Sequence, residues 1–181
     1  DILMTVDVGN LYQAQDMGVL RTLESETLNQ NIPFYLRDPQ NHWVGLTLRA
    51  RTIVYSSDRV KPEELSTYAD LADEKWRGRL CLRTSKKVYN QSLVASFIAH
   101  EGVEKATEIM HGWIANLAVA PFSNDNAAMN AIIAGQCDVS VVNTYYFGRM
   151  EADGKSADLK LFWPNQQSTG VHVNITGAGI T

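Results

Sequence analysis

The sequence lacks the features that mark membrane-spanning and nucleic-acid-binding proteins. Among its 181 residues, no apolar run approaches the roughly 20 residues that span a bilayer, so direct membrane insertion is not expected. Lysine and arginine number 16 against 20 aspartates and glutamates, and no basic run exceeds two residues. Binding to nucleic acid through phosphate neutralisation is therefore not expected. The hydrophobic share of 45% and the charged share of 20% are typical of a globular domain.

Motifs of common enzyme chemistry are also missing. The sequence has no glycine-rich phosphate loop, no nucleophile elbow, and no spacing of Ser, His and Asp that supports hydrolysis. A tyrosine acting as acid or base would need a second titratable partner, and none stands at a recognisable spacing. The chain is therefore not expected to be an enzyme. Its histidines do not form a metal-spaced set; they are His42, His100, His111 and His172.

Only two cysteines are present, Cys81 and Cys137. Each stands near the start of an expected strand, so a disulfide between them is possible if the two strands are neighbours. An exported protein would be free to form that bond. Two buried free thiols are the alternative, and the sequence alone leaves both open.

The sequence begins directly on a strand-like run, DILMTV, without an initiator Met or a signal peptide, and it also ends on a strand-like run. A chain that starts and ends inside regular structure is expected to be a fragment. The lack of a signal peptide therefore says nothing about the compartment.

Hydrophobic patterning predicts strands that alternate with helices. The expected strands cover residues 1–6, 43–57, 78–84, 137–142, 159–164 and 170–179. The expected helices cover residues 9–20, 61–76, 90–102, 104–117, 123–136 and 145–154, and residues 21–44 are expected to be mostly loop. This order predicts an α/β protein with a parallel or mixed sheet covered by helices.

Two adjacent tyrosines, Tyr145 and Tyr146, directly follow the end of an expected strand. Neighbouring residues of a strand point to opposite faces, so both rings can face one ligand only if the strand ends there. In open α/β sheets, ligands bind at this edge. Packing is the commoner role of such a pair. The functional alternative is a pair of phenolates, which needs a strong cation nearby because the pKa of a phenol is about 10. Ferric iron, a hard cation that prefers oxygen, is the natural candidate.

A third tyrosine, Tyr89, stands in the stretch LRTSKKVYN just before an expected helix. Hydroxyl groups and two lysines precede it, and the N-terminus of a helix attracts anions. Taken alone, an ordinary solvated loop is the simpler explanation. The stretch FSNDNAAMN is similar: Ser123, Asn124 and Asp125 are explained by helix capping, although they could also direct a helix N-terminus at a shared anion.

Several stretches together resemble the periplasmic ferric-ion-binding proteins, which are the substrate-binding components of bacterial iron ABC transporters. These stretches are TVDVGNLYQAQ, LRARTIVYSSDRV, WRGRLCLRTSKKVYNQSLVAS, GQCDVSVVNTYYFGRM and GVHVNITGAG. They are spread over nearly the whole chain, and NTYYFGR with the upstream VYNQSLVA is the most specific part. Related binders of polyamines, thiamine and phosphonates share the fold, but the tyrosine pair is not expected in them.

The resemblance implies roles for individual residues. Tyr145 and Tyr146 match the paired tyrosine ligands of the family. Tyr89 matches the third tyrosine of the subgroup that coordinates iron with three or more phenolates. Asp7 occupies the position where some members have a carboxylate ligand. Some family members bind a synergistic anion such as carbonate or phosphate, and the residues near the matching positions are Ser85, Asn124 and Asn143. The expected electrostatic partners of the site are Arg49 and Arg51, and Arg51 is also a candidate contact of the anion.

The fold implied by the resemblance is α/β, similar to type II periplasmic binding proteins, with two lobes, mixed sheets and a hinge. Because family members are longer than this chain, one nearly complete lobe and parts of the other are expected. Residues 1–52 would form part of lobe 1 and the first hinge strand. Residues 53–165 would form lobe 2 with the tyrosines, and residues 166–181 the return strand to lobe 1.

The function implied by the resemblance is capture of Fe(III) by tyrosine phenolates in an interlobe cleft. Three phenolates offset the 3+ charge of ferric iron. The protein would be a periplasmic monomer that delivers its iron to the membrane permease of an ABC importer. An alternative within the same fold is a protein that binds an organic or phosphorylated solute, with the tyrosines stacking on it or hydrogen-bonding to it.

Overall fold

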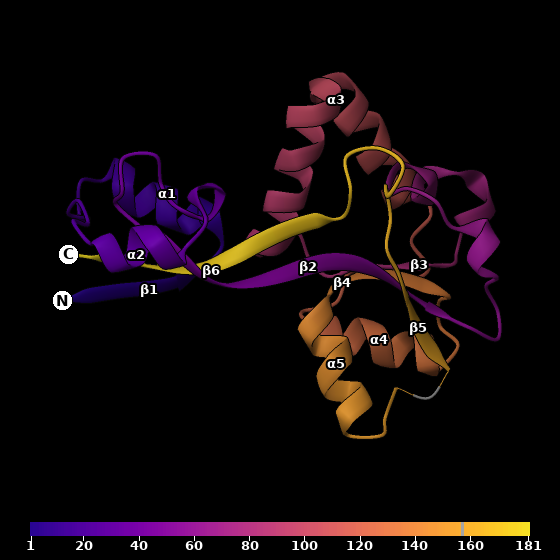
Figure 1. Ribbon diagram of the computed structural model, residues 1–181. Coiled ribbons are helices and arrows are strands. Elements are labelled where there is room, and N and C mark those ends of the chain that lie inside the picture. Colours follow the sequence, from indigo (N-terminus) through magenta and orange to yellow (C-terminus); the bar gives the residue numbers. More distant parts are fainter. Residues whose placement is uncertain (157) are drawn as a thin grey trace. The chain divides into compact units, whose positions relative to one another are not determined.

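The computed structural model describes residues 1–156 and 158–181 of the chain (Figure 1). The chain divides into two compact units: residues 1–49 and 173–181 form unit 1, and residues 50–172 form unit 2. The resemblance implied a lobe over residues 53–165, and the corresponding unit here covers residues 50–172. In the described residues, no helix is both long and apolar enough to cross a membrane.

Unit 1 is a small sheet with one helix packed against it. Strand β1 (Ile2–Val6) pairs antiparallel with β6 (His172–Ile180), and β6 also lies next to β2 (Val44–Ser56). Helix α1 (Val8–Asp16) follows β1 directly. A side chain at Gly177 would place its Cβ 2.6 Å from a Leu11 methyl carbon, so glycine lets helix and sheet approach closely. The buried core of the unit consists of Leu11, Ala14, Leu20, Trp43 and Ile175.

Apolar residues remain exposed on the strands of unit 1. In β1 the exposed positions alternate, so that Ile2 and Met4 are 73% and 63% exposed. Leu46 and Leu48 of β2 are 48% and 58% exposed. Alternate residues of a strand share one face. One face of β1 therefore presents hydrocarbon to water.

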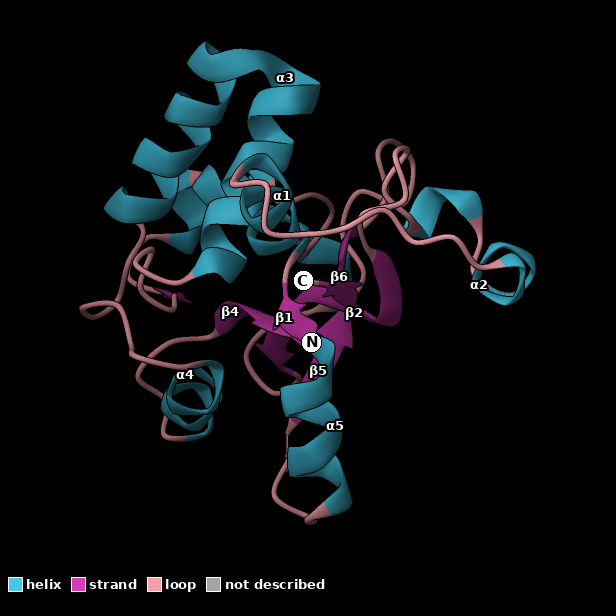
Figure 2. Cartoon of the chain, turned by 90° about the vertical axis from the view of Figure 1, so that its left-hand side faces the viewer, coloured by secondary structure: helices cyan, strands magenta, loops and turns pink. Residues whose placement is uncertain are grey.

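Unit 2 has a mixed sheet with helices on both faces. Strand β2 pairs antiparallel with β4 (Val139–Asn143) and β5 (Leu159–Phe162), while β4 pairs parallel with β3 (Leu80–Cys81). Figures 1 and 2 show α3 on one side of this sheet and both α4 and α5 on the other. The helices are α3 (Val88–Ala115), α4 (Asp125–Ile133) and α5 (Thr144–Ala152). The expected α/β class with a mixed sheet is confirmed.

The alternation of side chains along β2 explains these two layers. Ile53 and Tyr55 belong to the core cluster that includes Leu93, Phe97 and other α3 residues. Val54 points the other way and belongs to the cluster beneath α4 and α5. Period-two alternation in which both faces are apolar is typical of a strand buried on both sides.

Helix α3 is interrupted by a glycine, as the sequence predicts. Gly102 has φ 85° and ψ 165°, values outside the helical region, so two helical arms meet there. A second glycine, Gly112, lets the later arm pack against the turn at residues 69–72. A Cβ at Gly112 would stand 2.4 Å from the Cβ of Ala72, closer than two carbon atoms can approach.

One sequence prediction about local structure is wrong. Residues 61–76 form three short 3-10 turns instead of a helix, because side chains take over backbone hydrogen bonds there. Asn165 accepts from the Tyr68 N–H at 2.9 Å, and Thr67 accepts from the Asp70 N–H at 3.1 Å. Residues 21–44 are mostly loop, as expected, and also contain a short helix, α2 (Glu26–Asn31), which buries no residue and so leaves no apolar pattern.

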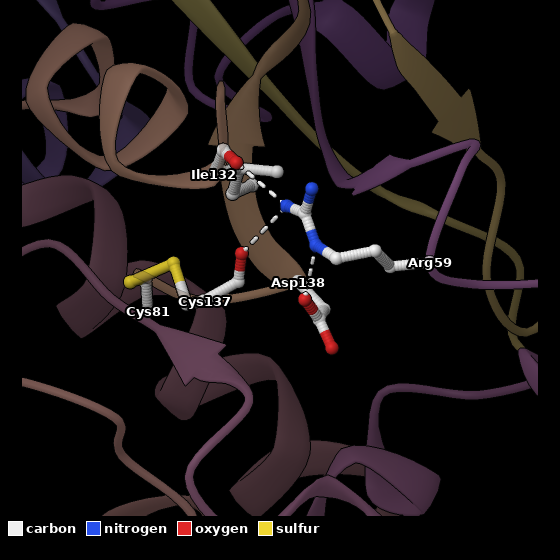
Figure 3. Close-up of a disulfide and its surroundings, with 5 residues drawn as sticks. All are labelled: Arg59, Cys81, Ile132, Cys137 and Asp138. Atoms are coloured by element: carbon white, nitrogen blue, oxygen red, sulfur yellow. Dashed lines mark hydrogen bonds and ion pairs between the residues drawn. A yellow bond between two sulfur atoms is a disulfide. The ribbon is translucent and has the colours of Figure 1, made fainter. Parts of the chain in front are cut away.

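Cys81 and Cys137 form a disulfide, which decides between the two alternatives left open by the sequence. The bond links strand β3 to the start of β4, and both cysteines are buried. Figure 3 shows the surroundings of the bond. Arg59 donates to the carbonyl oxygens of Ile132 and Cys137 at 2.6 and 3.1 Å, and to the carboxylate of Asp138 at 2.7 Å. Arg79 also donates to the Asp138 carboxylate, at 2.6 Å, so the loop that enters β4 is held by a covalent bond and by two arginines.

Loss of the disulfide is expected to lower the free energy of unfolding by about 2–4 kcal/mol. The bond joins residues 56 positions apart, and a cross-link over a loop of that length restricts the unfolded chain strongly. The measurement is urea unfolding of the protein and of a Cys81→Ala/Cys137→Ala variant, each with and without reductant. Reductant should destabilise the protein and leave the variant unchanged. Equal stability of the oxidised and reduced protein would contradict the expectation.

Candidate functional site

The tyrosine pair stands at the junction of a strand and a helix. Strand β4 ends at Asn143, and helix α5 begins at Thr144. Tyr145 and Tyr146 therefore lie in the first turn of α5, and their ring centroids are 4.3 Å apart. This confirms the expected change of structure that lets adjacent rings lie side by side.

The hydroxyl groups of three tyrosines meet in one cluster. The Tyr145 hydroxyl hydrogen-bonds with the hydroxyls of Tyr146 and of Tyr89, which lies in the first turn of α3. The Asn143 side-chain amide donates to the Tyr145 hydroxyl at 3.4 Å. All three tyrosines are partly buried. Two residues adjacent in sequence and a third from a distant helix thus present phenolic oxygens to one place.

The environment of Tyr145 favours the protonated phenol. Burial raises the pKa of Tyr145, and its hydrogen bonds with Tyr146 and Tyr89 raise it further. Such hydroxyls stay neutral unless a cation approaches and makes the phenolate the better partner. In the described part of the chain, no group of three or more His, Cys, Asp or Glu residues could hold a metal ion. The tyrosine oxygens are therefore the candidate metal ligands.

A buried arginine joins the segments that carry the tyrosines. Arg51 of β2 is 2% exposed, and it donates to the side-chain oxygens of Asn90, Asp125 and Asn143 at 2.6–3.2 Å. Asn90 lies one residue after Tyr89 in α3, and Asp125 is the first residue of α4. Burial lowers the pKa of Arg51, and the neighbouring Asp125 carboxylate opposes that change. One guanidinium group thus connects β4 with the first turns of two helices.

The charges beneath the tyrosines leave a positive excess. Asp125 also pairs with Arg83 at 3.5 Å, so two guanidinium groups share one carboxylate. The Arg83 guanidinium lies 4.9 Å from the centroid of the Tyr89 ring, and that of Arg149 lies 5.3 Å from the Tyr145 ring. Cations near a phenol favour its anionic form. The phenols are therefore neutral in the iron-free protein, while the nearby guanidinium groups would stabilise phenolates once a metal ion binds.

Three residues expected near a bound anion occupy different kinds of position. Asn143 is buried, with its side chain between Arg51 and Tyr145. Asn124 is exposed and caps α4, because its side-chain oxygen accepts from the Ala127 N–H at 2.9 Å. Ser85 is exposed in the loop before α3. Only Asn143 therefore contacts the tyrosine cluster directly among the described contacts.

The two arginines proposed as electrostatic partners belong to different units. Arg51 is in unit 2, and it donates to side chains of the protein itself. Arg49 is in unit 1, where it pairs with Asp7 at 3.2 Å. Arg51 therefore acts as an internal connector, and its role toward an anion stays a prediction.

Asp7 lies in unit 1 and not in the unit that carries the tyrosines. Its side chain caps α1 by accepting from the Gly9 N–H at 3.1 Å. The same carboxylate is held by Arg49 and by the Asn174 side-chain amide at 2.9 Å. These contacts give Asp7 a structural role, and its role as a metal ligand stays a prediction.

The sequence analysis did not single out Arg83 and Asn90, and it gave Asp125 a role in capping or in directing a helix N-terminus at an anion, but not as a partner of buried arginines. Arg83 and Asn90 lie inside a stretch that carries the resemblance, on either side of Tyr89, whereas Asp125 lies outside those stretches. The signal for them was the occurrence of charged or amide residues in segments that are otherwise buried, which requires a partner. Only the fold shows which partners these are.

The chain is similar to known iron-related proteins. It is 44% identical to iron uptake protein A1 of Synechocystis over 186 aligned residues, which cover 99% of this chain and 52% of that protein. The structure also matches the FutA (IdiA) protein of Trichodesmium, solved with iron and citrate, with a TM-score of 0.94 and 42% identity. That match covers 99% of this chain and 59% of the other.

A third likeness is to the ferric binding protein of Campylobacter jejuni, with a TM-score of 0.94 and 33% identity, covering 100% of this chain and 60% of that one. The chain spans about half the length of the curated relatives it matches. The family model described as bacterial extracellular solute-binding protein matches residues 1–178. Because that match takes in nearly all of the sequence, the chain belongs to the bacterial extracellular solute-binding protein family.

Proposed function

We propose that the chain is the part of a periplasmic iron-binding protein that captures Fe(III) through the phenolates of Tyr89, Tyr145 and Tyr146. The observation that carries this proposal is the hydrogen-bonded cluster of their three hydroxyl groups at the N-terminal turns of α3 and α5. Phenolate is a hard oxygen ligand, the kind that a trivalent cation prefers. The names of the similar proteins, which refer to iron uptake and ferric binding, support the same cargo.

The charges of the site support a bound anion beside the iron. Three phenolates neutralise Fe(III), and the two arginines with Asp125 leave one positive charge in excess. A small anion such as carbonate or phosphate would offset that charge and occupy coordination positions that the tyrosines leave open. The citrate in the Trichodesmium structure supports the presence of an anion in such sites. Ser85 and Asn124 stay the proposed outer contacts of the anion, with Asn143 closest to the tyrosines.

Delivery to the membrane permease of an ABC importer is the proposed fate of the iron. The solute-binding family to which the chain belongs supports this role and an extracytoplasmic location. The Cys81–Cys137 disulfide supports the location independently, because structural disulfides persist in oxidising compartments such as the periplasm. Release would follow reduction or protonation, since a phenolate holds Fe(II) less well and takes up a proton in acid.

The test is a titration of the iron-free protein with ferric citrate while the visible spectrum is followed. A broad band from phenolate-to-iron charge transfer is expected to appear and to saturate at one iron per chain. A colourless protein that binds an organic or phosphorylated solute by calorimetry would replace the proposal with the solute-binding alternative. Turnover of a substrate would contradict both.

Iron binding is expected to weaken as the pH falls. The pKa of Tyr145 is raised in the iron-free protein, so each phenol that becomes a ligand must release a proton, and acid competes with the metal. About three protons should be released per iron bound from ferric nitrilotriacetate, and about two in a Tyr89→Phe variant. A pH-stat measures this difference, in which the chelator's contribution cancels. Equal proton release by both proteins would exclude Tyr89 as a ligand.

A further inference from the structure

Unit 2 contains a cavity of about 140 Å³ that the iron proposal does not use. It lies between the loop before α3 and the two arms of that helix. Its mouth is open to solvent beside Ile114, which is 63% exposed. The apolar lining consists of Leu82, Leu93, Val94, Met110, Trp113, Ile114, Leu117 and Pro121, and the polar lining of Arg83, Ser85 and Asn90.

Arg83 is the charged group of the cavity wall. It is 9% exposed, and among the residues that the structure describes its Nε atom has no hydrogen-bond acceptor. Asn90 is fully engaged, because its oxygen accepts from Arg51 and its amide donates to the Arg83 carbonyl oxygen at 2.7 Å. Ser85 lies at the exposed rim. Because the Nε atom is itself enclosed, a ligand in the cavity would be attracted by the charge of the Arg83 guanidinium group and not by a hydrogen bond to Nε.

We propose that this cavity binds a small apolar carboxylate of about the size of benzoate. An engineered cavity of about 150 Å³ in another protein takes up benzene, so the volume suits one aromatic ring or a short branched chain. The apolar walls select hydrocarbon over a strongly hydrated anion such as phosphate. The positive excess of Arg51, Arg83 and Asp125 selects a carboxylate over a neutral molecule or a cation.

The site is separate from the tyrosine hydroxyls but shares Arg83 with their surroundings. The Arg83 guanidinium lies over the Tyr89 ring and pairs with Asp125. A carboxylate bound to Arg83 would therefore lie close to the first turn of α3, which carries Tyr89. The proposal does not rest on iron binding, and its test uses iron-free protein.

Calorimetric titration with benzoate and with benzyl alcohol tests the proposal. Benzoate is expected to bind one molecule per chain with a Kd of about 0.1–1 mM, the range that so small a ligand can reach. Benzyl alcohol, which has the same ring without the charge, is expected to bind at least about tenfold more weakly. No binding of benzoate at 10 mM, or equal affinity for both probes, would overturn the proposal.

Two variants locate the binding. Val94→Phe fills the cavity from α3 and should abolish benzoate binding, whereas Ile98→Phe makes the same kind of change on the same helix at a position that does not line the cavity. Arg83→Met should reduce benzoate affinity to that of benzyl alcohol. Circular dichroism of each variant checks that the helix content is unchanged. Benzoate binding that survives in Val94→Phe would place the ligand elsewhere and overturn the assignment.

Discussion

Replacing both Tyr145 and Tyr146 by phenylalanine is expected to abolish the visible band of the ferric protein and to weaken iron binding by more than about 100-fold. Loss of a residue that only supports a metal ligand costs about 10–100-fold in affinity, so loss of one tyrosine ligand is expected to cost at least about 100-fold. The two losses are not expected to add simply, because the two tyrosines are in contact. Phenylalanine keeps the two adjacent, tilted rings and removes only the oxygens. The measurement is competition for Fe(III) against a series of chelators of known affinity.

The chain offers matched controls for this experiment. Tyr12 and Tyr35 are 62% and 71% exposed in unit 1, and a Tyr12→Phe/Tyr35→Phe variant should keep both the band and the affinity. Each single variant, Tyr145→Phe or Tyr146→Phe, should shift the band and lose about 100-fold. If the double variant keeps the spectrum of the unaltered protein, the ferric proposal fails.

Asp125→Asn is expected to lower the free energy of unfolding by about 3–5 kcal/mol, the usual cost of removing one partner from a buried ion pair. Asp125 is fully buried and is the carboxylate that faces both Arg51 and Arg83. Asparagine keeps an oxygen that can accept from the Asn143 N–H, so the loss reports on charge more than on shape. Urea unfolding of the iron-free protein measures it.

An exposed aspartate provides the control for Asp125. Asp153 pairs with Lys155 at 3.1 Å, and both side chains are more than half exposed. Asp153→Asn should change the free energy of unfolding by less than about 1 kcal/mol, because water screens such pairs. Adding Arg83→Met to Asp125→Asn should recover part of the loss by removing one uncompensated cation. Similar small effects of Asp125→Asn and Asp153→Asn would show that the buried cluster contributes little.

The position of the tyrosine pair could be predicted because its cause is local. An apolar run ends at Asn143, and asparagine is depleted in strands, so a turn or helix was expected to begin there. The same reasoning placed the break at Gly102, where only a glycine readily adopts the backbone angles. These features depend on a few neighbouring residues, which the sequence displays directly.

The contacts that complete the site could not be predicted, because they depend on pairing across the fold. Tyr89 reaches Tyr145 only because β3 lies parallel to β4 and brings the start of α3 next to the start of α5. Arg51 reads as an ordinary polar residue of an alternating strand, and nothing nearby in the sequence reveals that Asp125 neutralises it. The resemblance supported a ligand role for the tyrosines, but it did not reveal the ion pairs beneath them.

The helix expected over residues 61–76 shows the opposite failure. Leu65, Tyr68 and Leu71 repeat at a helical spacing, and all three are buried. Only Leu71 lies inside a 3-10 turn, whereas Leu65 and Tyr68 flank the irregular segment between two such turns. Hydrophobic period alone does not distinguish the two geometries over so short a segment.

The bare hydrocarbon on the strands of unit 1 has a practical consequence for every titration suggested above. Exposed apolar side chains such as Ile2 and Met4 of β1, together with those on β2, favour self-association and adsorption to surfaces as the protein concentration rises. Light scattering at several protein concentrations should then show a mean particle size that decreases on dilution. Affinities for iron and for benzoate should therefore be measured at low protein concentration, where self-association does not compete with ligand binding.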